Sequence, residues 1–180
     1  TMVGLFVPLC LGAFASAAAQ EDISALVQAS VQSHRGNYFV TARDAIVEDP
    51  EGPVAYTKLG KIIGARKDGY NLFAGLPYAD RPERFEEPKP KQPWAPEVLN
   101  ATKFRQVCIG AGVGEPESED CLFMQAWVPQ GGIKNMPVIV YFHGGMNQHG
   151  GGFETFRRGD YAVQNKKYPT IFINFDWRLG

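Results

Sequence analysis

The sequence has little of several features that mark common classes of protein. Its 18 lysines and arginines nearly balance 19 aspartates and glutamates, a formal net charge of −1, so no surface for nucleic acid or an anionic membrane is indicated. Only three cysteines and three histidines occur, with no Cys-x-x-Cys pair and no histidine cluster, which argues against a metal. No internal repeat or low-complexity segment is present, and we expect no cofactor. The 180 residues of ordinary composition suit one globular domain.

The amino-terminal segment lacks the length of a membrane span. The apolar run from Val3 to Phe14 falls short of the roughly 20 residues that cross a bilayer. It leads into the small residues 15–19, which are typical of a signal-peptidase site, although no lysine or arginine precedes the run. We therefore predict a signal peptide over residues 1–19, a secreted protein and no stable membrane span. A buried helix of the mature fold and a membrane anchor are the alternatives.

Two features fit an exported chain. Cys10 would leave with the signal, and the remaining Cys108 and Cys121 most simply pair with each other in an oxidising compartment. Closing so short a loop would stabilise the fold by about 3 kcal/mol. Asn100 begins an Asn-Ala-Thr sequon, which predicts glycosylation at Asn100 in a secreted protein.

The segment after the predicted signal carries few structural signals. Residues 20–52 form a weakly specified lead-in, with apolar spacing that predicts a short helix over 22–33 and a turn or linker over 49–53. Residues 54–64 predict a hairpin around Leu59-Gly60, and residues 67–70 predict a second turn.

Proline recurs between residues 80 and 96 and excludes a helix there, because proline removes backbone donors and fixes φ. We predict an extended surface strap anchored in the core by Phe85 and Trp94. Beyond it, the last part of residues 118–129 alternates and predicts a strand, residues 161–167 predict one or two helical turns, and residues 170–175 predict a buried strand.

The rest of the chain is organised around a strand that opens into glycines. Val138 to Phe142 is an uncharged run of β-branched and aromatic residues, which predicts a strand buried on both faces, as in the middle of a parallel sheet. It breaks at once into His143-Gly144-Gly145. Glycines at that point bring bare backbone amides to the carboxyl edge of a sheet, where α/β proteins bind ligands. The pattern is typical of the oxyanion-hole loop of lipases and esterases.

Eight short blocks of the sequence resemble, in order, the type-B carboxylesterases, the cholinesterase-like branch of the α/β-hydrolase fold. The resemblance implies an α/β fold in which amino-terminal β-hairpins lead into a mixed, mostly parallel central sheet. It covers only the amino-terminal portion of such a domain, residues 53–180, so the chain looks truncated. The blocks are Phe73–Ala79, Arg84-Phe85, Pro93-Trp94, Ala101-Thr102, Cys108, Ser118–Leu122, His143–Gly145 and Arg178–Gly180.

The resemblance assigns the oxyanion hole to the first glycine run. The amides of Gly145 and Met146 would donate to the oxyanion, and Gly144 would allow close approach. Methionine stands where the family usually has a small residue, and it would cost roughly 1–2 kcal/mol if the position requires a positive φ. The run Gly150-Gly151-Gly152 offers an alternative register, and a merely flexible loop is a third interpretation.

No serine of this chain sits between glycines as a nucleophile elbow requires, so no catalytic residue is predicted within it. By resemblance, the serine, acid and histidine of the triad are expected beyond Gly180, and His143 has a structural role. The resemblance also implies an ion pair between Arg84 and Glu119, which ties the strap to the disulfide loop. Arg178 is expected to pair with a carboxylate.

The implied function is a secreted serine carboxylesterase that acts on a small-molecule carboxylic ester. Residues 109–120 contain no aromatic residue, whereas the corresponding cholinesterase loop carries a tryptophan for quaternary ammonium, so choline esters are disfavoured. The alternatives are a neuroligin-like adhesion protein without a working triad and an inactive truncated product. The oligomeric state is left open.

Overall fold

The computed structural model describes residues 46–131 and 136–179. The predicted signal peptide and the predicted helix over 22–33 lie outside these residues. The described elements are β1 (Ile46–Asp49), β2 (Gly52–Tyr56), β3 (Lys61–Arg66), β4 (Tyr70–Pro77), β5 (Val98–Ala101), β6 (Val107–Cys108), β7 (Glu117–Ser118), β8 (Phe123–Pro129), β9 (Val138–Phe142), a 3-10 turn η1 (Thr155–Arg157), α3 (Asp160–Val163) and β10 (Ile171–Phe175).

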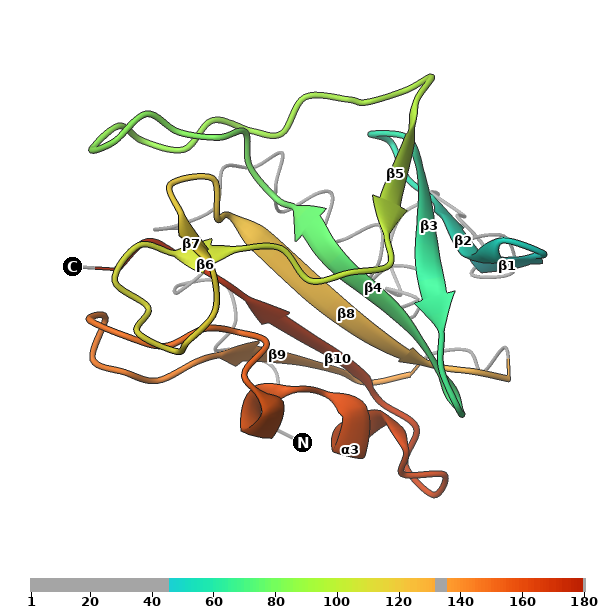
Figure 1. The fold of residues 1–180 in the computed structure, drawn as a ribbon. Helices are drawn as coiled ribbons and strands as arrows, with labels where there is room; N and C mark the ends of the chain where they lie inside the picture. Colours follow the sequence, from blue (N-terminus) through green and yellow to red (C-terminus); the bar gives the residue numbers. More distant parts are fainter. Residues whose placement is uncertain (1–45, 132–135, 180) are drawn as a thin grey trace, which may run out of the picture.

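One mixed sheet organises the described chain (Figure 1). Its strand order is β1-β2-β3-β4-β8-β10-β9, with β5 beside β3. The pairs β1–β2, β2–β3, β3–β4, β4–β8 and β8–β10 are antiparallel, whereas β9–β10 and β3–β5 are parallel. The predicted fold class, an α/β fold with a mixed sheet and amino-terminal hairpins, is confirmed. Within this sheet, parallel pairing is limited to those two strand pairs, because hairpins supply most of the other strands. A separate two-stranded sheet pairs β6 with β7 in parallel.

Local turn chemistry produces the predicted hairpins. Asp49 pairs with Gly52 across a two-residue turn, so the predicted turn or linker over 49–53 is a turn. Around Leu59-Gly60, Thr57 and Gly60 exchange backbone hydrogen bonds of 3.2 Å, and Gly60 has a φ of 145° that favours glycine. The amide of Lys67 donates to the carbonyl of Tyr70 at 2.9 Å and closes the next turn.

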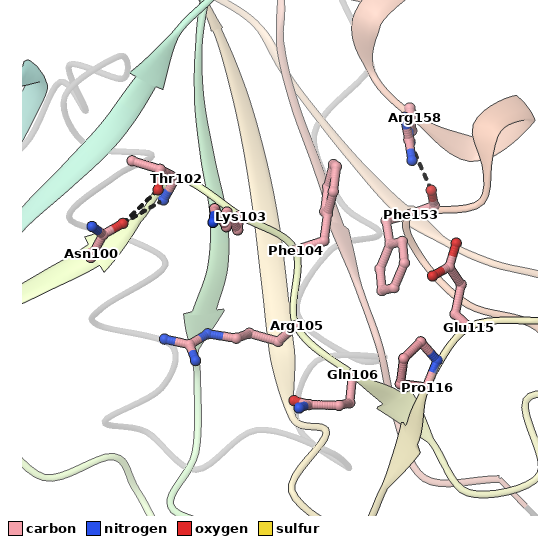
Figure 2. A pocket seen from close by; sticks show the side chains of 10 residues that line it. All are labelled: Asn100, Thr102, Lys103, Phe104, Arg105, Gln106, Glu115, Pro116, Phe153 and Arg158. Carbon is pink, nitrogen blue, oxygen red and sulfur yellow. Dashed lines mark hydrogen bonds between the residues drawn. The ribbon is translucent and has the colours of Figure 1, made fainter.

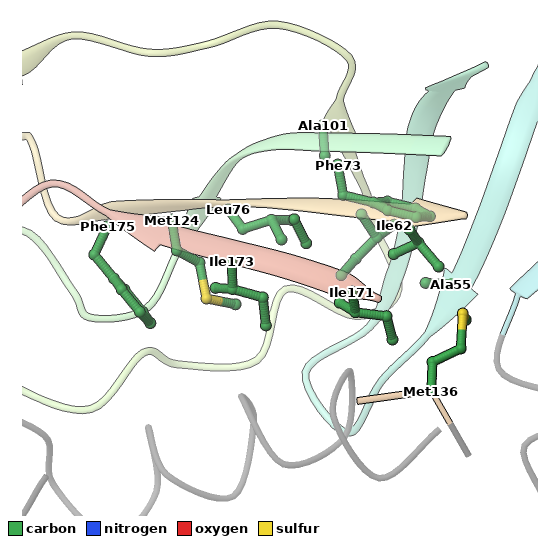
Figure 3. Packing of buried hydrophobic residues seen from close by; sticks show 12 residues of the cluster. Ala55, Ile62, Phe73, Leu76, Ala101, Met124, Met136, Ile171, Ile173 and Phe175 are labelled. Atoms are coloured by element: carbon green, nitrogen blue, oxygen red, sulfur yellow. The ribbon is translucent and has the colours of Figure 1, made fainter. Parts of the chain in front are cut away.

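The core lies mainly on one face of the sheet. Figure 3 shows side chains of β4, β8 and β10 directed to this face, among them Leu76, Met124 and Ile173. Gly75, with a φ of 69°, lies where the β4–β8 register shifts. A bulge at that point explains how Phe73 and Leu76, an odd number of residues apart, both reach the same core.

The second face of the sheet is covered by α3. Val163 of α3 packs with Leu72 and Trp127, and Asp160 accepts hydrogen bonds from Tyr70 and Trp127. The helix is shorter than the predicted segment 161–167. Its early end has a local cause, because the Asn165 side chain accepts hydrogen bonds from two following amides and makes a turn there.

Two burial predictions are wrong. Strand β9 was expected to be buried on both faces, yet Phe142 is 57% exposed and Ile139, Val140 and Tyr141 are also exposed. It is an edge strand: β10 pairs with one side, and no strand within the described residues pairs with the other. Phe85 was expected to anchor the strap but is 90% exposed, whereas Trp94 packs against the core and donates its ring N–H to Lys61.

Candidate functional site

The glycine-rich segment 143–153 lies at one edge of the sheet together with the end of β10. Phe142 is opposite Phe175 in the parallel β9–β10 pair, and their rings stack with centroids 5.4 Å apart. His143 and Asp176 therefore leave neighbouring strands in the same direction. This is the carboxyl edge, where α/β sheets place their ligand sites.

The first glycine run folds into a tight turn. The carbonyl of Gly145 accepts from the amides of Gln148 at 3.0 Å and His149 at 3.2 Å. Gly145 has a φ of 130°, and a Cβ built there would lie 1.9 Å from the His149 carbonyl oxygen, so only glycine fits. Met146 and Asn147 are both left-handed, with φ values of 54° and 59°. The Met146 side chain points outward and is 81% exposed.

The backbone amides of the first run have no hydrogen-bond acceptor among the described residues. Across residues 46–131 and 136–179, no hydrogen bond is donated by the amide of Gly144, Gly145 or Met146. Gly144 and Met146 are exposed and Gly145 is half-buried. These donors can therefore serve a bound ligand.

The second glycine run is used differently. The amide of Gly150 donates to the Ala111 carbonyl at 2.8 Å, that of Gly151 to Glu154 Oε2 at 3.1 Å, and that of Gly152 to Asp176 Oδ1 at 2.7 Å. All three donors are already paired. Binding an oxyanion in this alternative register would break these bonds, and each loss of a buried partner costs about 1–3 kcal/mol.

His143 is placed as a structural residue. It is buried, its ring stacks on Trp177 with centroids 3.6 Å apart, and its Nδ1 lies 3.0 Å from the Gly144 carbonyl. Burial is the largest effect on its pKa and lowers it, although the contact with Gly144 acts in the opposite direction. Burial thus favours the neutral form of the imidazole, which is packed beneath the loop.

Asp176 is a site residue that the sequence analysis missed. The side chain is 1% exposed, and its two oxygens accept from the amide of Gly152 and from Gln125 Nε2, the latter at 2.8 Å. Burial raises the pKa of Asp176 to about 6, while these two hydrogen bonds favour the ionised form. The sequence signal that could have identified Asp176 was its position directly after the predicted strand 170–175.

The predicted ties around the strap are present but lie at the surface. Arg84 Nη1 lies 3.3 Å from Glu119 Oε1, with the two side chains 66% and 32% exposed, so the pair contributes only about 0–1 kcal/mol. Cys108 and Cys121 are joined by a disulfide with Cα atoms 4.9 Å apart. Arg178 donates to the backbone carbonyl of Glu86 at 2.6 Å, not to a carboxylate as expected.

A separate cavity of about 560 Å³ lies between the end of β5 with the residues after it, the residues just before β7, and the segment 153–158 (Figure 2). Phe104 stacks on Phe153 within it, with ring centroids 5.0 Å apart. Figure 2 shows that the Arg105 and Arg158 side chains point in different directions, so their charges do not converge. The lining residues are Asn100, Thr102, Lys103, Phe104, Arg105, Gln106, Glu115, Pro116, Phe153 and Arg158.

Within residues 46–131 and 136–179, no group of three or more His, Cys, Asp or Glu side chains is arranged to hold a metal ion. None of the helices in this part of the chain has the length and hydrophobicity of a membrane span.

The hairpin-led mixed sheet and the glycine loop after a parallel strand are features of the α/β-hydrolase fold. Solved structures agree: one titled PNB esterase aligns at 32% identity with a TM-score of 0.64, over 71% of this chain and 27% of that one. A thermophilic PNB esterase aligns at 30% identity, also with a TM-score of 0.64, over 71% and 28%. Residues 51–180 match the model of the carboxylesterase family, and the chain belongs to that family.

Two of the curated relatives are named as esterases. The para-nitrobenzyl esterase of Bacillus subtilis (strain 168) is 32% identical over 139 residues, which are 71% of this chain and 28% of the relative. The juvenile hormone esterase of Tribolium castaneum is 32% identical over 151 residues, 76% of this chain and 25% of the relative. The chain thus spans about a quarter of the length of these relatives.

Proposed function

We propose that this chain belongs to a secreted serine carboxylesterase, and that its residues 53–180 are the amino-terminal portion of the esterase domain. This portion contributes the oxyanion half of the active site. The observation that carries the proposal is that the amides of Gly144, Gly145 and Met146, which follow β9 at the carboxyl edge of the sheet, donate to no group within residues 46–131 and 136–179. Membership of the carboxylesterase family supports an ester as the substrate.

The proposed chemistry is acyl transfer through an activated serine. Attack on an ester carbonyl creates a tetrahedral oxyanion, and each preorganised N–H donor to it contributes about 2.7–4 kcal/mol. The amides of Gly145 and Met146 would supply such donors. The serine, acid and histidine would come from the protein beyond Gly180. Ser118 is a poor nucleophile because its Oγ is engaged by the Asp120 amide at 3.0 Å in a surface turn.

The substrate class that we propose is a small carboxylic ester. The relatives include proteins named para-nitrobenzyl esterase, juvenile hormone esterase and bile salt-activated lipase, so their names do not single out one ester. The disulfide loop 109–120 holds no aromatic side chain, and we expect choline esters to be poor substrates.

We also propose that the protein enters the secretory pathway through the signal at residues 1–19. The disulfide between Cys108 and Cys121 and the exposed sequon asparagine, Asn100, support this. Expression of the full-length gene in a eukaryotic secretory host should yield protein in the medium. Asn100→Gln should lose the mass of one glycan. Retention of the protein in the cell, with an uncleaved amino terminus, would contradict the proposal.

The test of the enzymatic proposal is p-nitrophenyl ester hydrolysis by the full-length protein, together with organophosphate labelling. We expect hydrolysis and covalent labelling of one serine located beyond Gly180. Well-folded protein that neither hydrolyses nor labels would refute the esterase and favour the neuroligin-like adhesion protein. A transcript that ends at Gly180 would favour an inactive product.

A further inference from the structure

Asp176 is held at four points where β10 ends. Its amide donates to the Phe123 carbonyl at 2.9 Å, and its carbonyl accepts from the Tyr78 hydroxyl at 2.7 Å. One carboxylate oxygen accepts from Gly152 at 2.7 Å and the other from Gln125 at 2.8 Å. The carboxylate therefore joins the second glycine run rigidly to the central strand β8.

The second glycine run in turn supports the first. A Cβ built on Gly150 would lie 2.7 Å from both the Gly144 carbonyl oxygen and His143 Nδ1, so the two runs are packed backbone to backbone. Trp177, the residue after Asp176, stacks on the His143 ring from the strand side. The contacts thus form a continuous path from Asp176 through Gly152 and Gly150 to Gly144.

We propose that Asp176 is a positioning residue for the oxyanion loop. By accepting the Gly152 N–H, Asp176 fixes the second glycine run, and the backbone of Gly144 packs against that run. The position of Gly144 in turn sets the orientation of the Gly145 and Met146 amides. The proposal rests on the esterase function proposed above. It assigns different tasks to the two glycine runs: the first donates to the oxyanion, and the second carries the support.

The surroundings of Asp176 provide a matched neutral variant. Gln125 Oε1 is buried and has no hydrogen-bond partner among the described residues. An asparagine at 176 could accept from Gly152 and, once the Gln125 amide turns over to present this oxygen in place of Nε2, donate to it. Asp176→Asn should therefore keep the loop in place, whereas Asp176→Ala removes both hydrogen bonds. The nearby charged groups are Glu154 and Arg157, which are paired at 2.6 Å, and His143 interacts electrostatically with both.

The experiment measures kcat and KM of the full-length protein for a p-nitrophenyl ester, with kcat referred to active sites counted by organophosphate titration. We expect Asp176→Ala to lower kcat about 10- to 100-fold with KM changed less than about threefold, since misplaced oxyanion donors weaken transition-state binding. Asp176→Asn should restore kcat to within about threefold of wild type. Asp176→Ser, which is too short to reach Gly152, is the second variant if the alanine protein does not fold and should show the same fall.

Tyr70→Phe is the control for a general loss of stability. It removes a buried hydroxyl that donates to Asp160. Tyr70 is the first residue of β4, at the end of the strands opposite to the glycine loop. Its thermal midpoint should fall while kcat per site stays at the wild-type value. An unchanged kcat per site in Asp176→Ala or Asp176→Ser, or an asparagine variant as slow as these, would overturn the proposal. Wild-type protein that never labels would instead refute the esterase function itself.

Discussion

Replacing Met146 with glycine should stabilise the full-length protein, although methionine is the larger and more hydrophobic residue. Met146 adopts a φ of 54° and exposes 81% of its surface, so its side chain adds strain and buries little. A left-handed conformation costs a residue with a Cβ roughly 1–2 kcal/mol. Glycine offsets about 0.5–1 kcal/mol of that gain through its freedom in the unfolded chain. The net increase in the free energy of unfolding should be about 0.5–1 kcal/mol.

Urea denaturation followed by tryptophan fluorescence would measure this change, with Asn147→Gly as the matched control. Asn147 has a similar φ of 59°, but asparagine tolerates the left-handed region, so its replacement should alter stability by less than about 0.5 kcal/mol. A Met146→Gly protein that is less stable than wild type by more than about 1 kcal/mol would refute the reasoning, because it would mean that the side chain is packed against protein.

Three further outcomes follow from the same geometry. The pKa of Asp176 is raised from 3.8 to about 6, so the folded state binds more protons between these values and stability falls as pH rises through that window, by about 3 kcal/mol. Asp176→Asn should abolish that slope in urea titrations between pH 4 and 7 and be the more stable protein at pH 7.5. Gly145→Ala should lower the free energy of unfolding by at least about 2 kcal/mol and abolish ester hydrolysis, because its Cβ would meet the His149 carbonyl. In Gly144→Ala the new Cβ would have no atom within 4 Å, so this variant should have wild-type stability. Arg84→Ala should change the free energy of unfolding by less than about 1 kcal/mol, and a loss above 2 kcal/mol would contradict the surface character of its ion pair.

The parts of the fold that depend on local chemistry could be predicted from the sequence. The turns at 49–52 and 57–60, and the strand at 171–175, follow from glycine, proline and the pattern of β-branched residues. Burial was harder, because it depends on which strands become neighbours. An apolar run such as β9 has the same sequence pattern whether the strand lies at the centre or at the edge of a sheet. Phe85 was misplaced for the same reason, since an aromatic residue in a proline-rich strap can face either way.

The candidate site shows a similar division. The sequence located the glycine loop and offered two registers, but two runs of glycine carry no side chains by which to tell them apart. The difference lies in their acceptors: Ala111, Glu154 and Asp176 engage every amide of the second run, whereas the first run meets none within the described residues. Those acceptors come from separate parts of the chain and converge only in the folded sheet. In the proposed function, these acceptors explain why the first run, and not the second, would bind the oxyanion.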